Sequence, residues 1–361
     1  YEHLLQTAAN QFGFKSKLST ELCIFTFKQV IDFYSSYNNP VYVCYLDASK
    51  AFDKLNHWHL FQKLLDRGIP VLVVRFILYL YVHQKYTVRW GNCFSESFYV
   101  SNGAPQGRIL SPTFFNVYMD ELSTRLSSSD VGCIVNGVRM NHLLYADDSV
   151  LLSTSPYGMQ QLLNICDSYA NNYELKFNAK KTKCMVFKPK CFRDLQIPSL
   201  TLGSHKLDFT DCTKYLGCFI SQDSYDDQDI ERLIRSVYSR GNFLIHKFRY
   251  CTVDVKIRLF LAYCTSFYGI TTWFRFHENY KKRLDIAYKK IFRAFFRLKR
   301  EGTTFNMLNM NLKPFAVLER NLLFGFLQRI YCSNNLLVRE FVDSRLFMSS
   351  SHFLHIHKLL F

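Results

Sequence analysis

At residues 142–152 the chain carries the stretch His-Leu-Leu-Tyr-Ala-Asp-Asp-Ser-Val-Leu-Leu, in which Asp147 and Asp148 separate two apolar runs. Short runs rich in Leu and Val are typical of buried strands, so the stretch predicts a β-hairpin with both carboxylates at its turn. Adjacent carboxylates are unfavourable unless a positive group lies beside them. A divalent cation would supply that charge, although an Asp-Asp pair at a solvated turn is also common.

A second acidic strand end strengthens the metal interpretation. The run Val41–Leu46 is rich in β-branched and aromatic residues and is followed directly by Asp47. Two acidic strand ends can meet in one sheet. Mg²⁺ is usually held by one or two carboxylates together with substrate phosphates, so this pattern favours phosphoryl transfer.

The composition indicates the class of partner. The chain has 361 residues, a net charge of +16, 34 Phe and 23 Tyr. This length allows one large lobe or two to three small ones. A basic chain rich in aromatic side chains fits a nucleic-acid partner better than a membrane surface.

The cysteines and the apolar runs indicate an intracellular protein. The twelve cysteines are scattered, without the two-residue spacing of zinc ribbons, and predict reduced core thiols in the nucleus and cytoplasm. The chain begins at Tyr1 without a leading apolar segment, so we expect a fragment of a longer polypeptide that lacks a secretory signal. Runs 70–82 and 259–274 are shorter than the roughly 20 residues of a membrane span and predict buried helices.

Periodicity predicts a mixed α/β part followed by a helical part that begins at about Ser224. Ser19 is expected to cap the first helix, and Ser111 and Pro112 are expected to form the N-cap and first turn of a later one. Basic residues are frequent between 230 and 300, which is typical of a lobe that grips a duplex backbone. The predicted elements are helices at 19–34, 56–67, 71–82, 113–126 and 158–173, a hairpin around Gly91-Asn92, and strands at 184–187, 200–202 and 215–219.

Two further segments suit a nucleotide. The loop Gly103-Ala-Pro-Gln-Gly107 is framed by glycines and feeds a helix N-terminus, which favours phosphate binding, although a simple strand-to-helix turn is an alternative. Four lysines between 176 and 183 form either a solvated face or a set of cations for a triphosphate.

In their order and spacing, these motifs together resemble a reverse transcriptase. More narrowly, the chain resembles the enzyme of a non-LTR (LINE-type) retrotransposon of the chicken-repeat-like lineage. The segments that carry the resemblance are Gln11–Phe14 with Ser19-Thr20, Asp47 with Phe52, Gly103–Gly107, Ile109–Pro112, Tyr145–Asp148, Asn178 with Lys181-Thr182, Tyr215–Gly217, Asp229–Arg235, Gly241-Asn242 and Ser266–Gly269.

The resemblance implies an α/β (α+β) right-hand polymerase fold, with a palm built on a mixed antiparallel sheet, partial fingers and a helical thumb. The expected boundaries are partial fingers at 1–38, palm at 39–69 and 101–223, a fingers insertion at 70–100, thumb and C-terminal region at 224–342, and a tail at 343–361.

The resemblance also implies roles for individual residues. Asp47, Asp147 and Asp148 would hold two Mg²⁺ ions, with Mn²⁺ as an alternative, and Lys181 would protonate the leaving pyrophosphate. Phe52 would act as a steric gate against ribonucleotides, although composition alone favours a core Phe. The expected contacts to template and dNTP are Gly103, Pro105, Gln106 and Gly107, and the expected primer grip is Tyr215, Leu216 and Gly217.

The implied function is RNA-directed DNA synthesis with an RNA template, a DNA primer or target DNA and dNTPs, away from any membrane. One alternative is a truncated or decayed remnant that binds nucleic acid without catalysis. Arg108 next to the glycine loop and the missing basic segment before Gln11 favour that alternative. An RNA-dependent RNA polymerase is disfavoured by Phe52 and by Ala146 before the aspartates.

Overall fold

The computed structural model describes residues 1–48, 50–189 and 198–360, and the chain forms two compact units. Unit 1 contains Tyr1–Cys23, Tyr34–Thr210 and Asn335–Leu337, and unit 2 contains Ile24–Phe33, Asp211–Asn334 and Val338–Phe361. Each unit is described separately.

A five-stranded sheet in the order β13-β10-β1-β9-β8 forms the centre of unit 1. Strand β1 (Val41–Leu46) pairs antiparallel with β10 (Lys183–Phe187) and with β9 (Asp148–Ser153). Strand β8 (His142–Tyr145) continues the antiparallel order beyond β9, whereas β13 (Asp208–Phe209) joins β10 in parallel. All of β1 is buried, as expected of a strand covered on both faces. The predicted mixed sheet is confirmed.

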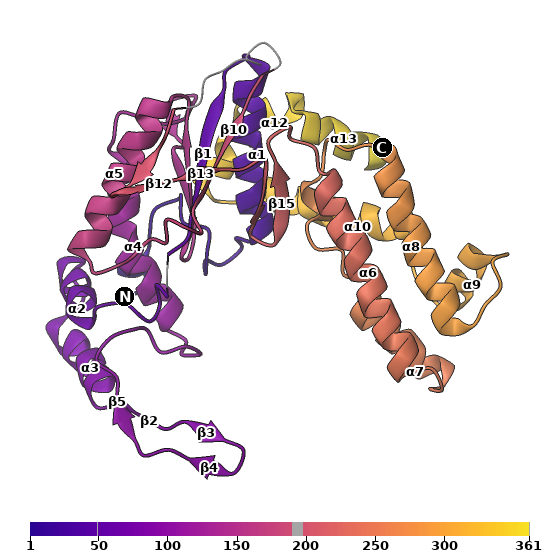
Figure 1. The fold of residues 1–361 in the computed structure, drawn as a ribbon, viewed down its shortest axis with the longest axis horizontal. Coiled ribbons are helices and arrows are strands. Elements are labelled where there is room, and N and C mark those ends of the chain that lie inside the picture. Colours follow the sequence, from indigo (N-terminus) through magenta and orange to yellow (C-terminus); the bar gives the residue numbers. More distant parts are fainter. Residues whose placement is uncertain (49, 190–197, 361) are drawn as a thin grey trace. The chain divides into compact units, whose positions relative to one another are not determined.

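Helices α4 (Ser111–Ser127) and α5 (Pro156–Asn172) pack against each other and against the sheet (Figure 1). Tyr42, Cys44 and Leu46 alternate along β1 and join the same apolar core as the two helices. Helix α1 (Thr20–Ser36) begins at its predicted cap, because the Ser19 hydroxyl accepts the Leu22 N–H at 3.3 Å.

The predicted cap of α4 is wrong. Leu110 occupies the N-cap position, and Ser111 is the first residue of the helix. The Ser111 hydroxyl instead donates to the Pro105 carbonyl at 2.6 Å, so it ties the helix to the preceding glycine loop. Pro112 lies in the first turn, as predicted.

Helices α2 (His57–Asp66) and α3 (Val71–Val82) match their predicted ranges. The prediction that α3 is buried is wrong, because Leu72 and Phe76 are 77% and 62% exposed. The buried side chains of α3, at Val74, Ile77 and Tyr81, form one narrow stripe, so the helix lies at the surface of unit 1.

A β-arm follows α3, and Figure 1 shows it extending away from that helix. Strand β2 (Lys85–Tyr86) pairs with β5 (Phe98–Tyr99), and β3 (Arg89–Trp90) pairs with β4 (Cys93–Phe94). The predicted hairpin around Gly91 is confirmed, with Gly91 at φ +59°. The remaining short elements of unit 1 are η1 (Glu2–Leu5), β6 (Ile134–Val135), β7 (Val138–Arg139), β11 (Thr201–Leu202) and β12 (His205–Lys206).

Unit 2 is mainly helical, which confirms the change of periodicity predicted from Ser224 onward. In Figure 1, α6 and α8 run side by side, and a Cβ on Gly241 would lie 2.3 Å from the Ile291 side chain, so the glycine permits this close approach. The helices of this unit after residue 226 are α6 (Asp227–Lys247), α7 (Val253–Cys264), η3 (Ile270–Thr272), α8 (Glu278–Phe296), α9 (Thr303–Asn309), α10 (Phe315–Tyr331), α11 (Leu336–Asp343, whose first two residues belong to unit 1), α12 (Leu346–Ser349) and α13 (Ser351–Leu360).

Two predictions for unit 2 are wrong. The apolar run 259–274 is not one buried helix, since it is divided between α7 and η3, although Phe260 and Trp273 are buried in it. The predicted strand 215–219 is a hairpin of β14 (Cys212–Tyr215) and β15 (Cys218–Ser221). Leu216 and Gly217 form its turn, with φ of 45° and 84° that a strand cannot accommodate.

The described cysteines are free thiols, including Cys44 and Cys184, whose sulfur atoms lie 3.4 Å apart. Cys93 and Cys332 are exposed, so the core prediction is wrong for these two, and Cys191 lies outside the described residues. No helix within the described ranges is long and apolar enough to span a membrane.

Candidate functional site

Asp47 directly follows β1, and its main chain is held by the segment after α5. The Asp47 carbonyl accepts the Asn178 N–H at 2.8 Å, and its own N–H lies 3.4 Å from the Thr182 hydroxyl. Strand β1 pairs with β9 through Leu46 and Ser149. The two acidic strand ends therefore meet in one sheet.

The turn between β8 and β9 consists of Ala146 and Asp147, and Ala146 has φ +58°. The side-chain oxygen of Gln11 accepts the N–H groups of Ala146, at 3.0 Å, and of Gly13, at 2.8 Å. A Cβ on Gly13 would lie 2.4 Å from the Ala146 nitrogen. The segment around Gln11 thus clamps the acidic turn in a backbone conformation that non-glycine residues rarely adopt.

Burial and neighbouring carboxylates change the pKa of Asp147 and of Asp148. Burial raises the pKa of Asp147, and the nearby charge of Asp47 raises it further, against hydrogen bonds from backbone N–H groups of the turn. Partial burial, followed by the charges of Asp147 and Asp47, raises the pKa of Asp148 to about 6. Neighbouring like charges favour binding of a cation.

Lys181 is the nearest observed counter-charge to Asp47. Its Nζ lies 3.8 Å from the Asp47 carboxylate, and the two side chains are 68% and 39% exposed. An ion pair this open to solvent contributes at most about 1 kcal/mol to stability, so Lys181 can leave Asp47 and pair with a bound ligand at little cost.

The donor set suits a hard divalent cation, because Asp47, Asp147 and Asp148 all offer carboxylate oxygens. Within the residues that the structure places, no three His, Cys, Asp or Glu side chains converge as closely as the ligands of a bound ion. Mg²⁺ requires one or two carboxylates and completes its coordination with water and phosphate oxygens. These residues therefore fit an ion whose coordination a substrate completes.

Phe52 is held by two other rings. Its ring stacks on Phe115, with centroids 4.1 Å apart, and meets Phe14 edge-on at 6.2 Å. Phe52 nevertheless stays half-buried. The ring is fixed in position while part of it remains accessible to a substrate.

The glycine loop is docked on the segment that carries Phe52. The Ala104 N–H donates to the Phe52 carbonyl and the Gly103 N–H to the Leu55 carbonyl, both at 2.7 Å. Gly103 has φ +94°, and a Cβ there would lie 2.9 Å from the Asp53 carbonyl oxygen. The structure therefore brings Phe52 and the loop together, and only glycine fits this approach without strain.

The two ends of the loop differ. Pro105 is buried beneath Ser111, whereas Gln106, Gly107 and Arg108 are exposed. The exposed end is the part of the loop that a ligand can reach.

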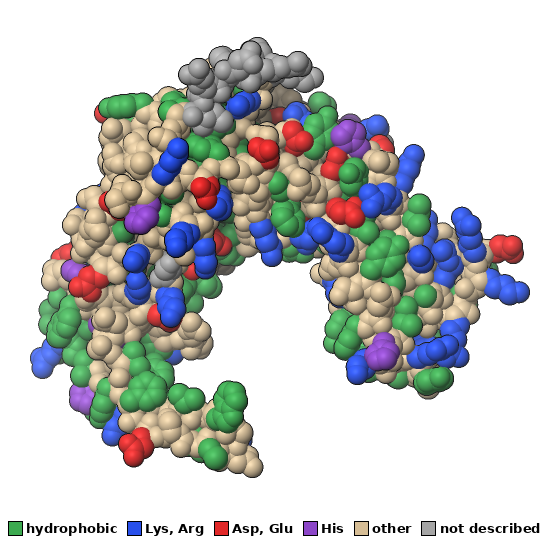
Figure 2. Space-filling view, in the orientation of Figure 1, with side chains coloured by type: hydrophobic (Ala, Val, Ile, Leu, Met, Phe, Trp, Pro, Cys, Tyr) green, Lys and Arg blue, Asp and Glu red, His purple; other side chains and the backbone are tan. Residues whose placement is uncertain are grey.

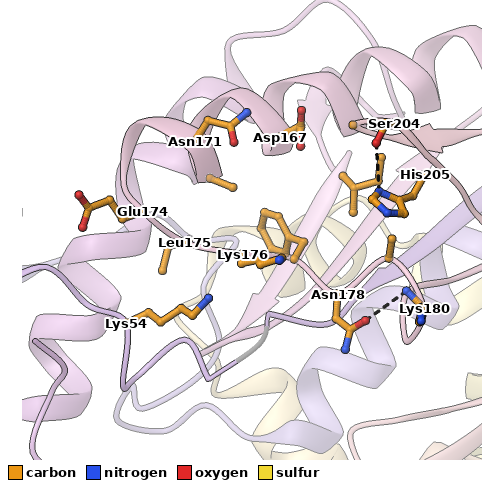
Figure 3. A pocket seen from close by; sticks show the side chains of 15 residues that line it. Lys54, Asp167, Asn171, Glu174, Leu175, Lys176, Asn178, Lys180, Ser204 and His205 are labelled. Atoms are coloured by element: carbon orange, nitrogen blue, oxygen red, sulfur yellow. Dashed lines mark hydrogen bonds between the residues drawn. The ribbon is translucent and has the colours of Figure 1, made fainter.

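A cavity of about 910 Å³ is lined by Asn178, whose N–H donates to the Asp47 carbonyl. In Figure 3, Lys54 extends along this cavity toward Asn178, and Asp167 and Glu174 lie on α5 and just beyond it. Lys176 and Lys180 also line it. Because both signs of charge are present, the cavity has no clear preference for an anion.

Tyr215, Leu216 and Gly217 lie at the β14–β15 turn, with Tyr215 buried. They belong to unit 2, whereas the three aspartates belong to unit 1. The predicted site residues are thus carried by both units.

The basic residues predicted to grip a duplex are mostly exposed on unit 2, and Figure 2 shows many Lys and Arg side chains over its helices. Lys256 is an exception, since it is buried against Phe295. The exposed members include Arg235, Lys247, Arg249, Arg258, Lys282, Arg283, Lys290, Arg297, Lys299 and Arg300.

Sequence reasoning assigned no role to Gln11. The segment Gln11–Phe14 carries part of the family resemblance, but the resemblance implies no role for its glutamine. The link to Ala146 joins positions 135 residues apart, so local periodicity carries no information about it.

A family model described as "Reverse transcriptase (RNA-dependent DNA polymerase)" matches residues 2–220, more than half of the chain. The chain is 34% identical over 183 residues to the Pol polyprotein of the type-2 retrotransposable element R2DM of Drosophila melanogaster, covering 49% of this chain and 17% of the relative. It is 25% identical to the RNA-directed DNA polymerase from mobile element jockey of Drosophila funebris, covering 65% of this chain and 26% of the relative. The chain thus spans about a quarter or less of these relatives.

Among solved structures, apo telomerase from Candida tropicalis aligns with 97% of this chain and 55% of its own, at 12% identity and a TM-score of 0.46.

Proposed function

The chain belongs to the reverse transcriptase family, and from this membership we propose that it is the polymerase domain of a non-LTR retrotransposon enzyme that copies RNA into DNA. Family membership and the mixed sheet confirm the predicted α/β right-hand polymerase fold class. The observation that carries the proposal is the meeting of Asp47 with the Asp147-Asp148 turn in one sheet.

We assign metal binding to Asp47 and Asp147, with Asp148 in support. The proposed ions are two Mg²⁺, which Mn²⁺ can replace. When bound, the ions would activate the primer 3′-hydroxyl and neutralise charge on the triphosphate. The protein contributes a turn that Gln11 holds in place before substrate arrives, so little reorganisation is needed during reaction.

The proposed incoming nucleotide is a dNTP. Phe52 would exclude a ribose 2′-hydroxyl. Its contacts with Phe115 and Phe14 support this role, because a ring that excludes a hydroxyl by steric clash must be held in position. Gly103, Pro105, Gln106 and Gly107 would contact template and nucleotide. Of these, Gln106 and Gly107 are exposed enough to do so directly.

Lys181 would protonate the leaving pyrophosphate. Its weak, exposed pairing with Asp47 supports this role, because a general acid must reach the reacting oxygen. Tyr215, Leu216 and Gly217 would hold the primer, and the exposed cations of unit 2 would bind the template–primer duplex by phosphate contacts. The partners would be an RNA template and a DNA primer or target DNA.

The lobe boundaries given under Sequence analysis, the chicken-repeat-like lineage and a nuclear and cytoplasmic location remain proposals. A second candidate function is nucleic-acid binding without catalysis. The observation that favours it is Arg108, which stands exposed beside Gly107 at the accessible end of the nucleotide loop.

Primer extension on an RNA template, with dNTPs and Mg²⁺, tests the proposal. The wild-type chain should extend the primer and stop when EDTA is added. Asp47→Asn should lose extension while duplex binding is retained, and Asp130→Asn, a change at a fully exposed aspartate, should behave as wild type.

Equal extension by the wild type and Asp47→Asn would overturn the assignment. Duplex binding by a wild-type chain that does not extend the primer would favour the second candidate.

A further inference from the structure

Three segments singled out by the resemblance have no role in the proposed chemistry: Asp229–Arg235, Gly241-Asn242 and Ser266–Gly269. All three belong to unit 2, as does the β14–β15 turn. Two of them converge on that turn.

Tyr268 contacts the turn directly. Its hydroxyl donates to the Leu216 carbonyl at 2.5 Å. A Cβ on Gly217 would lie 2.8 Å from the Tyr268 ring, so the ring rests against the turn backbone. Both turn residues have positive φ, a conformation that external contacts must help to hold.

Asp229 fixes the strand that leaves the turn. The carboxylate is 1% exposed and accepts the Phe219 N–H and the Trp273 indole N–H, both at 2.9 Å. Arg232 adds two donors to it, at 2.7 and 3.0 Å. These donors come from the β15 backbone, an indole ring and the Arg232 guanidinium of α6.

Arg232 closes the connection between Asp229 and Tyr268, because it also donates to the Tyr268 carbonyl at 2.9 Å. Gly269 permits the approach, since it has φ +92° and a Cβ there would lie 2.6 Å from the Cys218 sulfur. The result is a continuous set of contacts from α6 to Leu216.

We propose that Asp229, Arg232 and Tyr268 form a brace that positions the Leu216–Gly217 turn for the primer strand. This inference rests on the proposed function, in which the turn grips the primer. A turn that is already ordered loses less conformational entropy when the primer binds. The three residues are positioning residues, since they act through the turn backbone.

Tyr268→Phe is the most selective test, because it removes the hydroxyl and keeps the ring. The KM for primer should rise about three- to tenfold, the usual effect of one hydrogen bond, while kcat and the KM for dNTP stay within twofold of wild type. Tyr263→Phe, at an exposed tyrosine of α7, is the matched control and should change none of these values.

Hydrogen exchange supplies a measurement independent of activity. The Gly217 and Cys218 amides should exchange faster in Tyr268→Phe than in wild type, with no change in the five-stranded sheet of unit 1. Arg232→Lys, which keeps the positive charge but loses the bidentate hydrogen bonding to Asp229, should show the same pattern.

An unchanged primer KM together with unchanged exchange at the turn would overturn the brace. A wild-type chain that extends no primer would instead overturn the proposed function, and the exchange measurement would still decide whether the brace orders the turn.

Discussion

Aspartates in unit 1 and in unit 2 differ in how their charge is balanced. In unit 1, Asp47, Asp147 and Asp148 meet at strand ends, where burial and neighbouring carboxylate charges raise the pKa of Asp147 and Asp148, and the nearest cation, Lys181, is only weakly paired. In unit 2, Asp226 is buried and is paired with Lys28, and it also accepts the Phe274 N–H at 3.0 Å.

The difference distinguishes an acid that stabilises the fold from acids that we propose bind metal ions. A buried carboxylate that receives a cation and several N–H groups has its charge balanced within the protein. Neighbouring carboxylates without a close cation carry a negative charge that a bound cation can balance. The same residue type therefore indicates a structural part in one unit and a candidate metal site in the other.

Asp226→Asn should produce the largest loss of stability, because it leaves the buried Lys28 ammonium unpaired. We expect the free energy of unfolding to fall by about 3–5 kcal/mol. Denaturant titration measures this change, with the exposed Asp254→Asn in α7 as control. A loss below about 1 kcal/mol would break the distinction between the two groups of acids.

Gly13→Ala tests whether the acidic turn depends on its clamp. The added methyl group would lie 2.4 Å from the Ala146 nitrogen, so the turn must shift. We expect a stability loss of about 1–3 kcal/mol and a fall in extension rate of up to about 100-fold.

Gly325→Ala is the control, because no heavy atom lies within 4 Å of a Cβ added there in α10. This change should raise stability by about 0.5–1 kcal/mol. Similar behaviour of the two alanine variants would show that the clamp has no effect.

Phe52→Ala should weaken the selection of dNTPs over ribonucleotides by about 10- to 100-fold in kcat/KM, because it removes the ring that we propose excludes a ribose 2′-hydroxyl. The ratio is measured by single-nucleotide incorporation with matched dNTP and rNTP. Phe305→Ala, at an exposed ring of α9, should leave the ratio unchanged. Undiminished selection in Phe52→Ala would return Phe52 to a purely packing role.

Glu121→Gln gives the smallest expected effect and a dependence on pH. Burial alone would raise the pKa of Glu121, but hydrogen bonds from Lys63 and Tyr173, together with Arg125, lower it from 4.5 to about 2. Ionised Glu121 therefore stabilises the fold above about pH 4.5, and this contribution is lost as pH falls toward 2.

About a third of the Glu121 side chain is exposed, and burial lowers the pKa of its partner Lys63, so we expect the substitution to cost about 1 kcal/mol at pH 7. Unfolding measured at pH 7 and at pH 3 should show the difference between wild type and variant shrinking at the lower pH. A constant difference would contradict the assigned ion pair.

The elements were predictable wherever local pattern decides structure. The hairpin at 142–152, the strand before Asp47 and the helix capped by Ser19 follow from periodicity and caps. Ser111 was misassigned because its hydroxyl bonds to Pro105, which sequence alone does not place within reach. The prediction of a strand through Leu216 was wrong. The apolar residues there are typical of a strand, but Leu216 and Gly217 adopt positive φ and form a turn.

The long-range partners were beyond sequence reasoning. Lys28 and Asp226 are 198 residues apart, and neither position carries a local signal of the pairing. The exposed apolar face of α3 was not predicted for a related reason. The hydropathy of a segment depends on its own residues and does not tell whether other elements pack over it.

Single-turnover extension of a primer on an RNA template by Asp147→Asn tests the central claim most directly, with duplex binding and thermal unfolding measured on the same preparation. We expect extension to fall at least about 1,000-fold while binding and the unfolding temperature match the wild type. Extension within about tenfold of wild type by a folded Asp147→Asn protein would contradict the account, since the acidic turn would then not carry the chemistry.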